Sequence, residues 1–286
     1  MKGGRIWAQN PKSTNSRDLA AGVAFFVKAA PAQLVKELKE GVPLQVDPNT
    51  IASGTLTGEG SAEAFAKLAL KPDTVKKFQK AEAGDALNLS AEELATFKAL
   101  GGDKAAPQDV EAKVKALLLA RYQAYKSKGL GGIAPYDRGG DKRSPADELR
   151  TFTQGSRTLQ KYAPAAWAAL DSYPGGKPAD AEEKFKWIYF LANKSPTLAL
   201  MHGMAVIEGD AVIILQRQFY VSEGFNCEQA IAARLPVAEG TVIVYANHTS
   251  TDQVEGFGGG AKKSIGTRMM SGQLQSLFEK LQKKGR

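Results

Sequence analysis

Residues 197–222 read TLALMHGMAVIEGDAVIILQRQFYVS, two apolar stretches joined by a short polar one. Large apolar residues recur at every second position of each stretch, which is the spacing expected of half-buried β-strands. The joining sequence Glu208-Gly209-Asp210 is typical of a short hairpin turn. Because a connection this short pairs its strands in opposite directions, the stretch predicts an antiparallel hairpin.

The same period-2 pattern occurs on either side of this hairpin, in residues 184–193 and 241–247. Four such segments with short connections predict an antiparallel sheet in the last third of the chain. Residues 226–234 lie between the third and fourth segments and fit either a short helix or a break in a strand. Cys227, the only cysteine, is expected to be a small buried residue because no Cys-His signature surrounds it.

A helix is expected to follow the sheet at residues 265–284. Its apolar residues recur at helical spacing and form one stripe. Such a stripe has to lie on an apolar surface, and the sheet that precedes it in the chain is the natural partner. The residues of the stripe are Met270, Leu274, Leu277, Phe278 and Leu281.

The rest of the chain divides into a loose beginning (1–18), an opening strand and helix (22–41) and a long helical segment (61–174). The apolar run VAFFV predicts the opening strand, and the proline and glycine that flank the next apolar face predict the helix. With the sheet and last helix (182–286), these segments predict a single α+β domain over residues 1–286. In this domain the antiparallel sheet packs on a long C-terminal amphipathic helix.

The helical segment contains two clear local signals and one long loop. Ser90-Ala-Glu-Glu93 is a capping box, in which the hydroxyl and the carboxylate satisfy free backbone donors at a helix start. Residues 107–128 carry the clearest helical stripe. Residues 129–144, GLGGIAPYDRGGDKRS, form a glycine-rich loop, and an unstructured loop of this length is either functional or a linker.

The chain of 286 residues carries a formal net charge of +8, which favours acidic partners such as anionic lipid or nucleic acid. The excess is concentrated in residues 261–286, which hold seven basic residues and one acidic residue. This segment fits either a solvated helix face with a basic tail or a contact surface for an anion or a membrane. The contact residues of the second interpretation are Lys262, Lys263 and Arg268. Nucleic acid is disfavoured because no nucleic-acid motif and no interleaved aromatic residues accompany these charges.

Residues 256–264, GFGGGAKKS, fit the dinucleotide pattern G-x-G-x-x-A. The expected strand ends several residues before this pattern, and only 25 residues follow Ala261, so the rest of such a fold has no room. A P-loop is excluded because Ala261 stands where that motif needs glycine. Two interpretations remain, a glycine-rich turn that holds an anion at a helix start and a flexible hinge.

Several polar residues occur among the apolar strand residues. His202 shares a strand face with large apolar residues and fits either a core histidine or a cavity-lining one. Arg217 either points into its apolar row or lies on an outer face, in which case Gln216 and Gln218 turn inward. Apolar surroundings with a few orienting polar groups are typical of a ligand cavity. The candidate ligand-binding residues are Tyr189, His202, Arg217, Tyr245 and Asn247.

Residues 245–253, YANHTSTDQ, are dense in hydrogen-bonding side chains and fit either loop-end capping or the mouth of a ligand site. The chain has two histidines and no acidic residues at ligand spacing from them, so no metal site is expected. It also lacks the G-x-S-x-G motif of serine hydrolases. The sequence therefore assigns no catalytic residue, no metal and no cofactor.

Residues 22–40 are expected to form an opening strand and helix, and residues 182–286 a late antiparallel sheet and a long C-terminal helix entered through a glycine-rich turn. In this order the elements resemble the START-like (helix-grip, SRPBCC) superfamily. The resemblance implies a curved sheet that wraps the terminal helix around a cavity for lipids, isoprenoids, sterols or other apolar ligands. The helical segment 61–174 departs from that fold, because it is larger than the usual insertion.

The sequence favours a protein that binds or carries an apolar or amphipathic small molecule between the sheet and the C-terminal helix, without catalysis. One alternative is an enzyme that acts on such a ligand in the same cavity, with His202, Tyr189 or Arg217 as polar participants. The other is a basic protein that docks on an anionic membrane or on nucleic acid. The chain as given has no signal peptide and no apolar run long enough to span a membrane. The sequence does not decide the cellular compartment, because an exported form from which an upstream signal had been removed would also lack a signal peptide.

Overall fold

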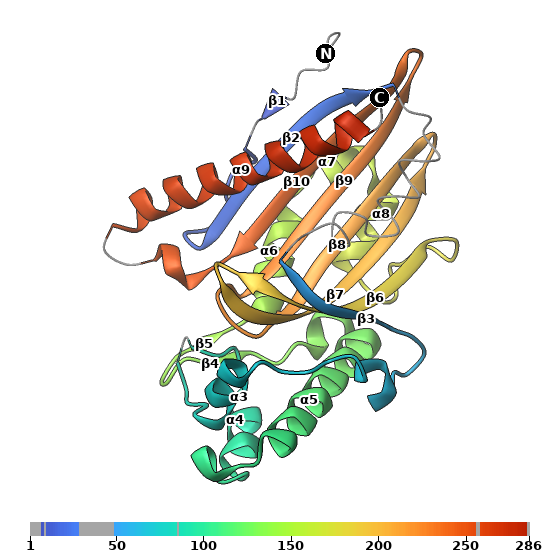
Figure 1. The fold of residues 1–286 in the computed structure, drawn as a ribbon. Coiled ribbons are helices and arrows are strands. Elements are labelled where there is room, and N and C mark those ends of the chain that lie inside the picture. The colour runs from blue at the N-terminus through green and yellow to red at the C-terminus, as the bar shows by residue number, and fades with distance from the viewer. Residues whose placement is uncertain (1–6, 9, 29–48, 85, 256–257, 285–286) are drawn as a thin grey trace.

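The computed structural model describes residues 7–8, 10–28, 49–84, 86–255 and 258–284, and side chains throughout these ranges except at residues 7, 8, 27 and 273–284. Within these residues eight strands form one antiparallel sheet in the order β1-β2-β10-β9-β8-β7-β6-β3 (Figure 1). The strands are β1 Trp7–Ala8, β2 Asp18–Val27, β3 Thr50–Leu56, β6 Glu182–Ala192, β7 Ser195–Glu208, β8 Ala211–Val221, β9 Cys227–Val237 and β10 Gly240–Ser250.

The sheet follows chain order from β6 to β10, because each of these strands returns beside the previous one through a short turn. The four strands predicted from the period-2 pattern are confirmed as β6, β7, β8 and β10. The β7–β8 turn places Gly209 at a φ of +56°, a backbone conformation that favours glycine. β2 pairs with β10, so the opening strand lies beside the last one.

Two parts of the chain differ from the sequence expectations, and a third expected element lies outside the described residues. Of residues 226–234, all but the first fall in strand β9 rather than in a helix or a strand break. Small alanines alternate there with larger residues, which weakens the period-2 signal. The beginning, expected to be loose through residue 18, is held near its end, where Asp18 is fully buried and accepts a hydrogen bond from the Thr14 amide. The opening helix expected within 22–41 lies outside the described residues.

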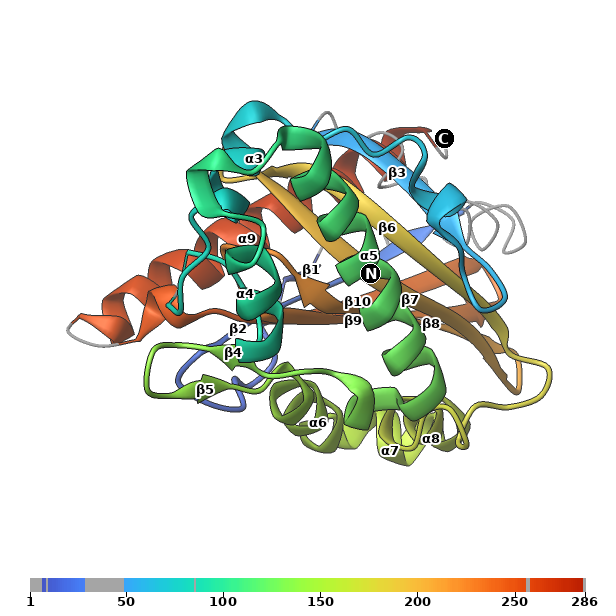
Figure 2. The ribbon, with the colours of Figure 1, turned by 90° about the horizontal axis from the view of Figure 1, so that it is seen from below.

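Helices from the middle of the chain form a layer on one face of the sheet (Figures 1 and 2). The predicted capping box is confirmed, since Ser90 accepts a bond from the Glu93 amide and the Glu93 carboxylate accepts one from the Ser90 amide. The predicted helix 107–128 is confirmed as α5. The elements are η1 Ala62–Phe65, α3 Pro72–Gln79, α4 Ala91–Lys98, η2 Gly102–Lys104, α5 Pro107–Lys128, η3 Gly129–Gly132, β4 Tyr136–Asp137, β5 Lys142–Arg143, α6 Pro145–Gly155, α7 Arg157–Tyr162 and α8 Pro164–Asp171.

The main apolar core lies between this helical layer and β6, β7 and β8. Tyr125 of α5 stacks on Phe219 of β8 with ring centroids 4.0 Å apart. Phe185 and Trp187 of β6 are buried in the same cluster. Aromatic side chains of the helical layer and of the sheet therefore pack together in one core.

The last helix, α9 (Gly259–Lys284), lies on the opposite face of the sheet and packs along β2 (Figures 1 and 2). A Cβ atom built on Gly266 would lie 3.1 Å from a methyl group of Leu19, so this glycine permits the close approach. α9 begins six residues before the expected start of 265, and Met270 of the predicted stripe is half-buried. The remaining stripe residues, Leu274, Leu277, Phe278 and Leu281, lie outside the described side chains. Among the described residues no helix combines the length and apolarity needed to cross a bilayer.

Ion pairs fasten the glycine-rich loop 129–144 to the end of the sheet. Arg138 and Arg143 of this loop contact the two carboxylate oxygens of Asp252, at 3.2 and 2.8 Å. Arg138 also donates a 3.0 Å hydrogen bond to the amide oxygen of Asn226. Asp252 opens a short 3-10 turn, η4 (Asp252–Val254), directly after β10. The loop and the polar segment 245–253 therefore meet as structural partners at one end of the sheet.

Candidate functional site

The strand register divides the predicted site residues between the two faces of the sheet. Side chains of adjacent strands that pair directly lie on the same face. One such row crosses five strands on the face that carries the helical layer, and we call it the inner row. Its members are Phe185, His202, Arg217, Gln229 and His248.

His202 is a fully partnered core histidine. Its Nδ1 lies 3.0 Å from the Tyr125 hydroxyl, and its Nε2 lies 3.0 Å from a carboxylate oxygen of Glu183. Burial is the largest influence on His202 and lowers its pKa, while Glu183 acts in the opposite direction. Burial alone would raise the pKa of Glu183, but the hydrogen bonds from His202 and Tyr173 lower it. The ring is therefore a neutral packing element of the core.

Arg217 is 1% exposed and also points into the helical layer. Its Nε donates to the side-chain oxygen of Gln229 at 2.9 Å, and one terminal nitrogen donates to the Thr153 hydroxyl at 2.8 Å. Among the described residues these neutral acceptors replace the carboxylate that usually accompanies a buried guanidinium. Burying a charge in this way is costly unless hydrogen bonds surround it. Thr153 of the helical layer and Gln229 of β9 provide two, while the other terminal nitrogen, Nη1, is buried without a described partner.

Two other inner-facing polar groups, His248 and Tyr189, have partners as well. His248 lies 2.9 Å from a carboxylate oxygen of the buried Asp18, which is the neighbouring strand's residue on the same face. The hydroxyl of Tyr189 lies 2.6 Å from that of Thr74 in α3 and accepts a bond from the Lys71 amide. The side chains of Tyr189, His202 and Arg217 are thus all hydrogen-bonded to groups of the helical layer or of the strands of the sheet. They do not face α9, so of the five candidates only Tyr245 and Asn247 lie on the side where the sequence places the ligand.

Tyr245 and Asn247 lie on the opposite face, toward α9. They belong to a group of five polar residues that we call the α9-facing cluster: Gln218, Glu228, Tyr245, Asn247 and Thr249. Thr249, Glu228 and Gln218 pair directly across three strands, and Thr249 lies 3.8 Å from the sulfur of Met270 in α9. This cluster therefore sits between the sheet and the terminal helix, where the sequence places the ligand site.

Hydrogen bonds within the cluster leave one acceptor unused. The Gln218 amide donates to Glu228 at 3.0 Å, and the Thr249 hydroxyl donates to the Asn247 oxygen at 2.9 Å. The Asn247 amide contacts the Tyr245 hydroxyl at 3.4 Å. The side-chain oxygen of Gln218 is buried and has no hydrogen-bond partner among the residues that the structure describes. A buried acceptor without a donor is costly, so this oxygen marks a position where a donor would be stabilised.

The carboxyl group of Glu228 keeps its proton to a higher pH than an ordinary glutamate does. Burial raises the pKa of its carboxyl group, and hydrogen bonds from Asn247, Gln218 and Thr249 only partly oppose this effect. A protonated carboxyl is a hydrogen-bond donor as well as an acceptor. The cluster can therefore present both types of group to a neutral molecule.

The cluster is surrounded by apolar side chains on the same face of the sheet. Each of these is at most 7% exposed, although α9 packs mainly along β2 at one side of the sheet. Polar groups collected in one place within an apolar surface are typical of a site that orients an amphipathic ligand. The apolar residues are Ala21, Val23, Phe25, Ile188, Ala199, Met201, Ala230, Ala232 and Ile243.

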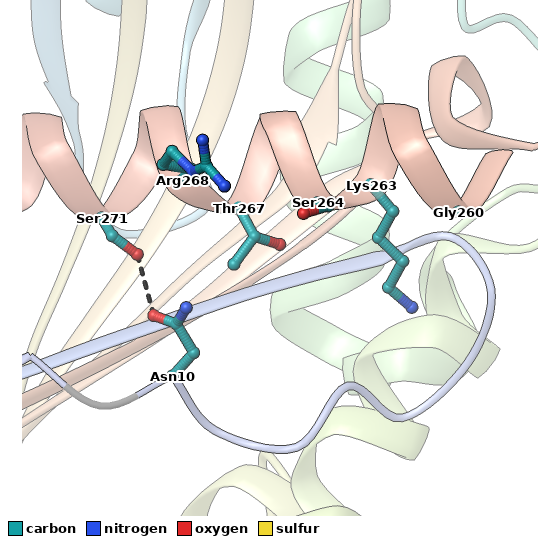
Figure 3. Close-up of a pocket in the computed structure, with 7 residues that line it drawn as sticks. All are labelled: Asn10, Gly260, Lys263, Ser264, Thr267, Arg268 and Ser271. Atoms are coloured by element: carbon teal, nitrogen blue, oxygen red, sulfur yellow. Dashed lines mark hydrogen bonds between the residues drawn. The ribbon is translucent and has the colours of Figure 1, made fainter. Parts of the chain in front are cut away.

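A separate groove of about 520 Å³ lies on α9 itself (Figure 3). Lys263 and Arg268, two of the predicted anion contacts, line it, whereas the third, Lys262, is exposed outside it. Lys263 donates to the backbone oxygen of Asn15 at 2.6 Å, which ties the N-terminal segment to α9. None of the five predicted ligand-binding residues lines this groove. The lining residues are Asn10, Gly260, Lys263, Ser264, Thr267, Arg268 and Ser271.

Sequence reasoning named Gln218 only as the alternative to Arg217, and it missed Glu228. Alternation along β9 could have found Glu228, because Glu228, Ala230 and Ala232 occupy every second position. Cys227 is fully buried and burial raises the pKa of its thiol, as expected of a small core residue. Comparison with family models, curated proteins and solved structures finds no match to this chain. The functional argument therefore rests on the geometry of this structure.

Proposed function

We propose that the protein binds and carries a neutral amphipathic molecule with a hydroxyl group, held between the α9-facing side of the sheet and α9. The buried oxygen of Gln218 is the observation that carries the proposal, because it lacks a donor inside an otherwise apolar surface. A ligand hydroxyl would supply that donor, and the apolar side chains around the cluster would form an apolar contact surface for the body of the ligand.

The chemistry of the cluster favours a neutral ligand over an acidic one. A carboxylate beside Glu228 would have to share a desolvated space with a second carboxyl group, which disfavours the ionised form of either. Arg217 lies on the other face of the sheet, and the half-buried cations that share the face of the cluster, Lys186 and Arg234, do not pair directly with Glu228 in the strand register. Sterol-like and isoprenoid alcohols therefore fit this site better than fatty acids.

The element order supports the resemblance to START-like proteins. An opening strand, a late antiparallel sheet and a terminal helix occur in the implied sequence, and α9 lies on one face of the sheet. The helical layer occupies the other face, which leaves only the α9 side for a ligand of the kind that this resemblance implies.

Native mass spectrometry and lipid extraction of the purified protein test the proposal directly. A co-purifying neutral lipid, or displacement of a fluorescent sterol by isoprenoid alcohols in preference to fatty acids, is the expected result. Gln218→Met keeps the side-chain volume but removes the acceptor, and should weaken binding about tenfold.

The matched control is Gln160→Met, a change of the same type at an exposed position of α7 in the helical layer. It should leave binding unchanged. The proposal fails if no sterol or isoprenoid alcohol binds, or if both variants bind as tightly as the wild type.

A further inference from the structure

The outward side of α9 combines exposed apolar and basic side chains. Ile265 and Met269 are each 59% exposed and lie one helical turn apart. Lys262 and Arg268 are exposed on either side of them. At 3.6 residues per turn, the four side chains form one continuous arc of the helix surface. Two apolar residues flanked by cations are the composition of a helix that lies at a membrane interface.

The groove of about 520 Å³ continues this arc on the other side of Arg268. Its lining includes two cationic side chains and three hydroxyl groups, and no carboxylate occurs among the lining residues. Figure 3 shows Lys263, Thr267 and Ser271 extending from α9 toward the segment that carries Asn10. Cations and hydroxyl donors around one space are suited to a phosphate group.

We propose that the first half of α9 docks the protein on an anionic phospholipid bilayer, with a headgroup phosphate in the groove and Ile265 and Met269 in the interfacial region. Charge alone would equally suit nucleic acid. The exposed apolar pair separates the two, because side chains without aromatic rings or donors gain nothing from a phosphodiester backbone. This docking does not depend on the ligand proposed above, since it uses the outward side of α9.

Vesicle sedimentation with phosphatidylcholine alone and with added phosphatidylserine tests the docking surface on the full chain. Binding should require phosphatidylserine and weaken as sodium chloride rises. Lys262→Gln with Arg268→Gln should lower the partition coefficient about 25-fold, at roughly fivefold for each cation. Ile265→Ser with Met269→Ser should lower it about tenfold.

The controls are exposed residues of the same types elsewhere. Lys98→Gln with Lys104→Gln in the helical layer, and Ile207→Ser at the end of β7, should bind vesicles as the wild type does. Unfolding curves of all variants should coincide, which shows that lost binding is not lost folding. Inorganic phosphate should compete more strongly than chloride at equal ionic strength if the groove holds a headgroup phosphate.

Four outcomes would overturn the proposal. They are equal binding to neutral and anionic vesicles, no vesicle binding at all, equal loss in the control variants, and tighter binding to a DNA duplex than to anionic vesicles. Failure here would leave sterol binding by Gln218 untouched, and failure of sterol binding would leave vesicle binding untouched, so the two proposals are tested separately.

Discussion

Both faces of the sheet carry polar side chains among apolar ones, but the polar side chains of the two faces differ in their hydrogen-bond partners. On the inner face, the helical layer supplies the hydroxyl of Thr153 for the guanidinium of Arg217 and the hydroxyl of Tyr125 for His202, and Gln229 of β9 supplies an amide oxygen for Arg217. On the α9 side, Gln218 keeps a buried oxygen without a described partner. Arg217 and Gln218 are consecutive residues of β8, so the same strand contributes to both faces. One terminal nitrogen of Arg217 and the side-chain amide nitrogen of Gln229 also lack a described partner, so the inner row keeps unused donors where the α9 side keeps an unused acceptor.

This difference teaches that burial of a polar group does not identify a functional site by itself. A buried polar group whose partners all come from the protein stabilises one arrangement of the core. A buried polar group that lacks one partner has a favourable interaction still to make. The following predictions test whether the two faces differ in this way.

The largest effect is expected from Arg217→Ala. Truncation removes a large buried side chain and the hydrogen bonds that it donates to Gln229 and Thr153, so the free energy of unfolding should fall by about 2–5 kcal/mol. Arg217→Met, which keeps most of the volume and removes the buried charge, should recover part of this loss. Urea denaturation followed by circular dichroism measures both.

Gln218→Ala is the matched change on the other face. It should cost less than about 1.5 kcal/mol in stability while weakening ligand binding. If Arg217→Ala and Gln218→Ala have equal effects on both quantities, the distinction between the two faces is wrong.

Tyr125→Phe should have the next largest effect. The change removes the hydroxyl that lies 3.0 Å from His202 Nδ1, and the buried nitrogen loses that partner. We expect a loss of about 1–3 kcal/mol in the free energy of unfolding. The control is Tyr162→Phe at a residue that is 70% exposed, which should change stability by no more than about 0.5 kcal/mol. Equal effects would mean that the hydroxyl of Tyr125 does not support the inner row.

Glu228→Gln should have the smallest effect, and its size should depend on pH. Folding raises the pKa of Glu228 above its ordinary value of 4.5. Its contribution to stability is therefore fully present below that value and is lost as pH rises through the folded-state pKa. Glutamine resembles the neutral acid at every pH.

The free energy of unfolding of the variant relative to wild type should thus increase, by an amount on the order of 1 kcal/mol, as pH rises from about 4 to about 8. Denaturation curves of both proteins across this range measure it. A difference that does not change with pH, or one that decreases, would show that Glu228 is not held in a desolvated site.

Much of the fold could be predicted because local patterns report local structure. Alternation along β7 and β8, the hairpin turn at Gly209 and the capping box at Ser90 each depend on neighbouring residues only. β9 was not recognised, because its alanines resemble helix and strand residues alike. β3 was not predicted at all, since its residues alternate between half-buried and exposed and lack a clear apolar side.

By itself, the sequence determined which residues share a strand face, because alternation along a strand is fixed by the geometry of the backbone. It placed Arg217 opposite to Gln218 and grouped His202 with its apolar row. Only the tertiary structure decided that the helical layer covers the first face and α9 lies on the second. That choice depends on partners that are far away in the chain, such as Tyr125 for His202, 77 residues apart, and Thr153 for Arg217, 64 residues apart. No local pattern records which distant element will supply them.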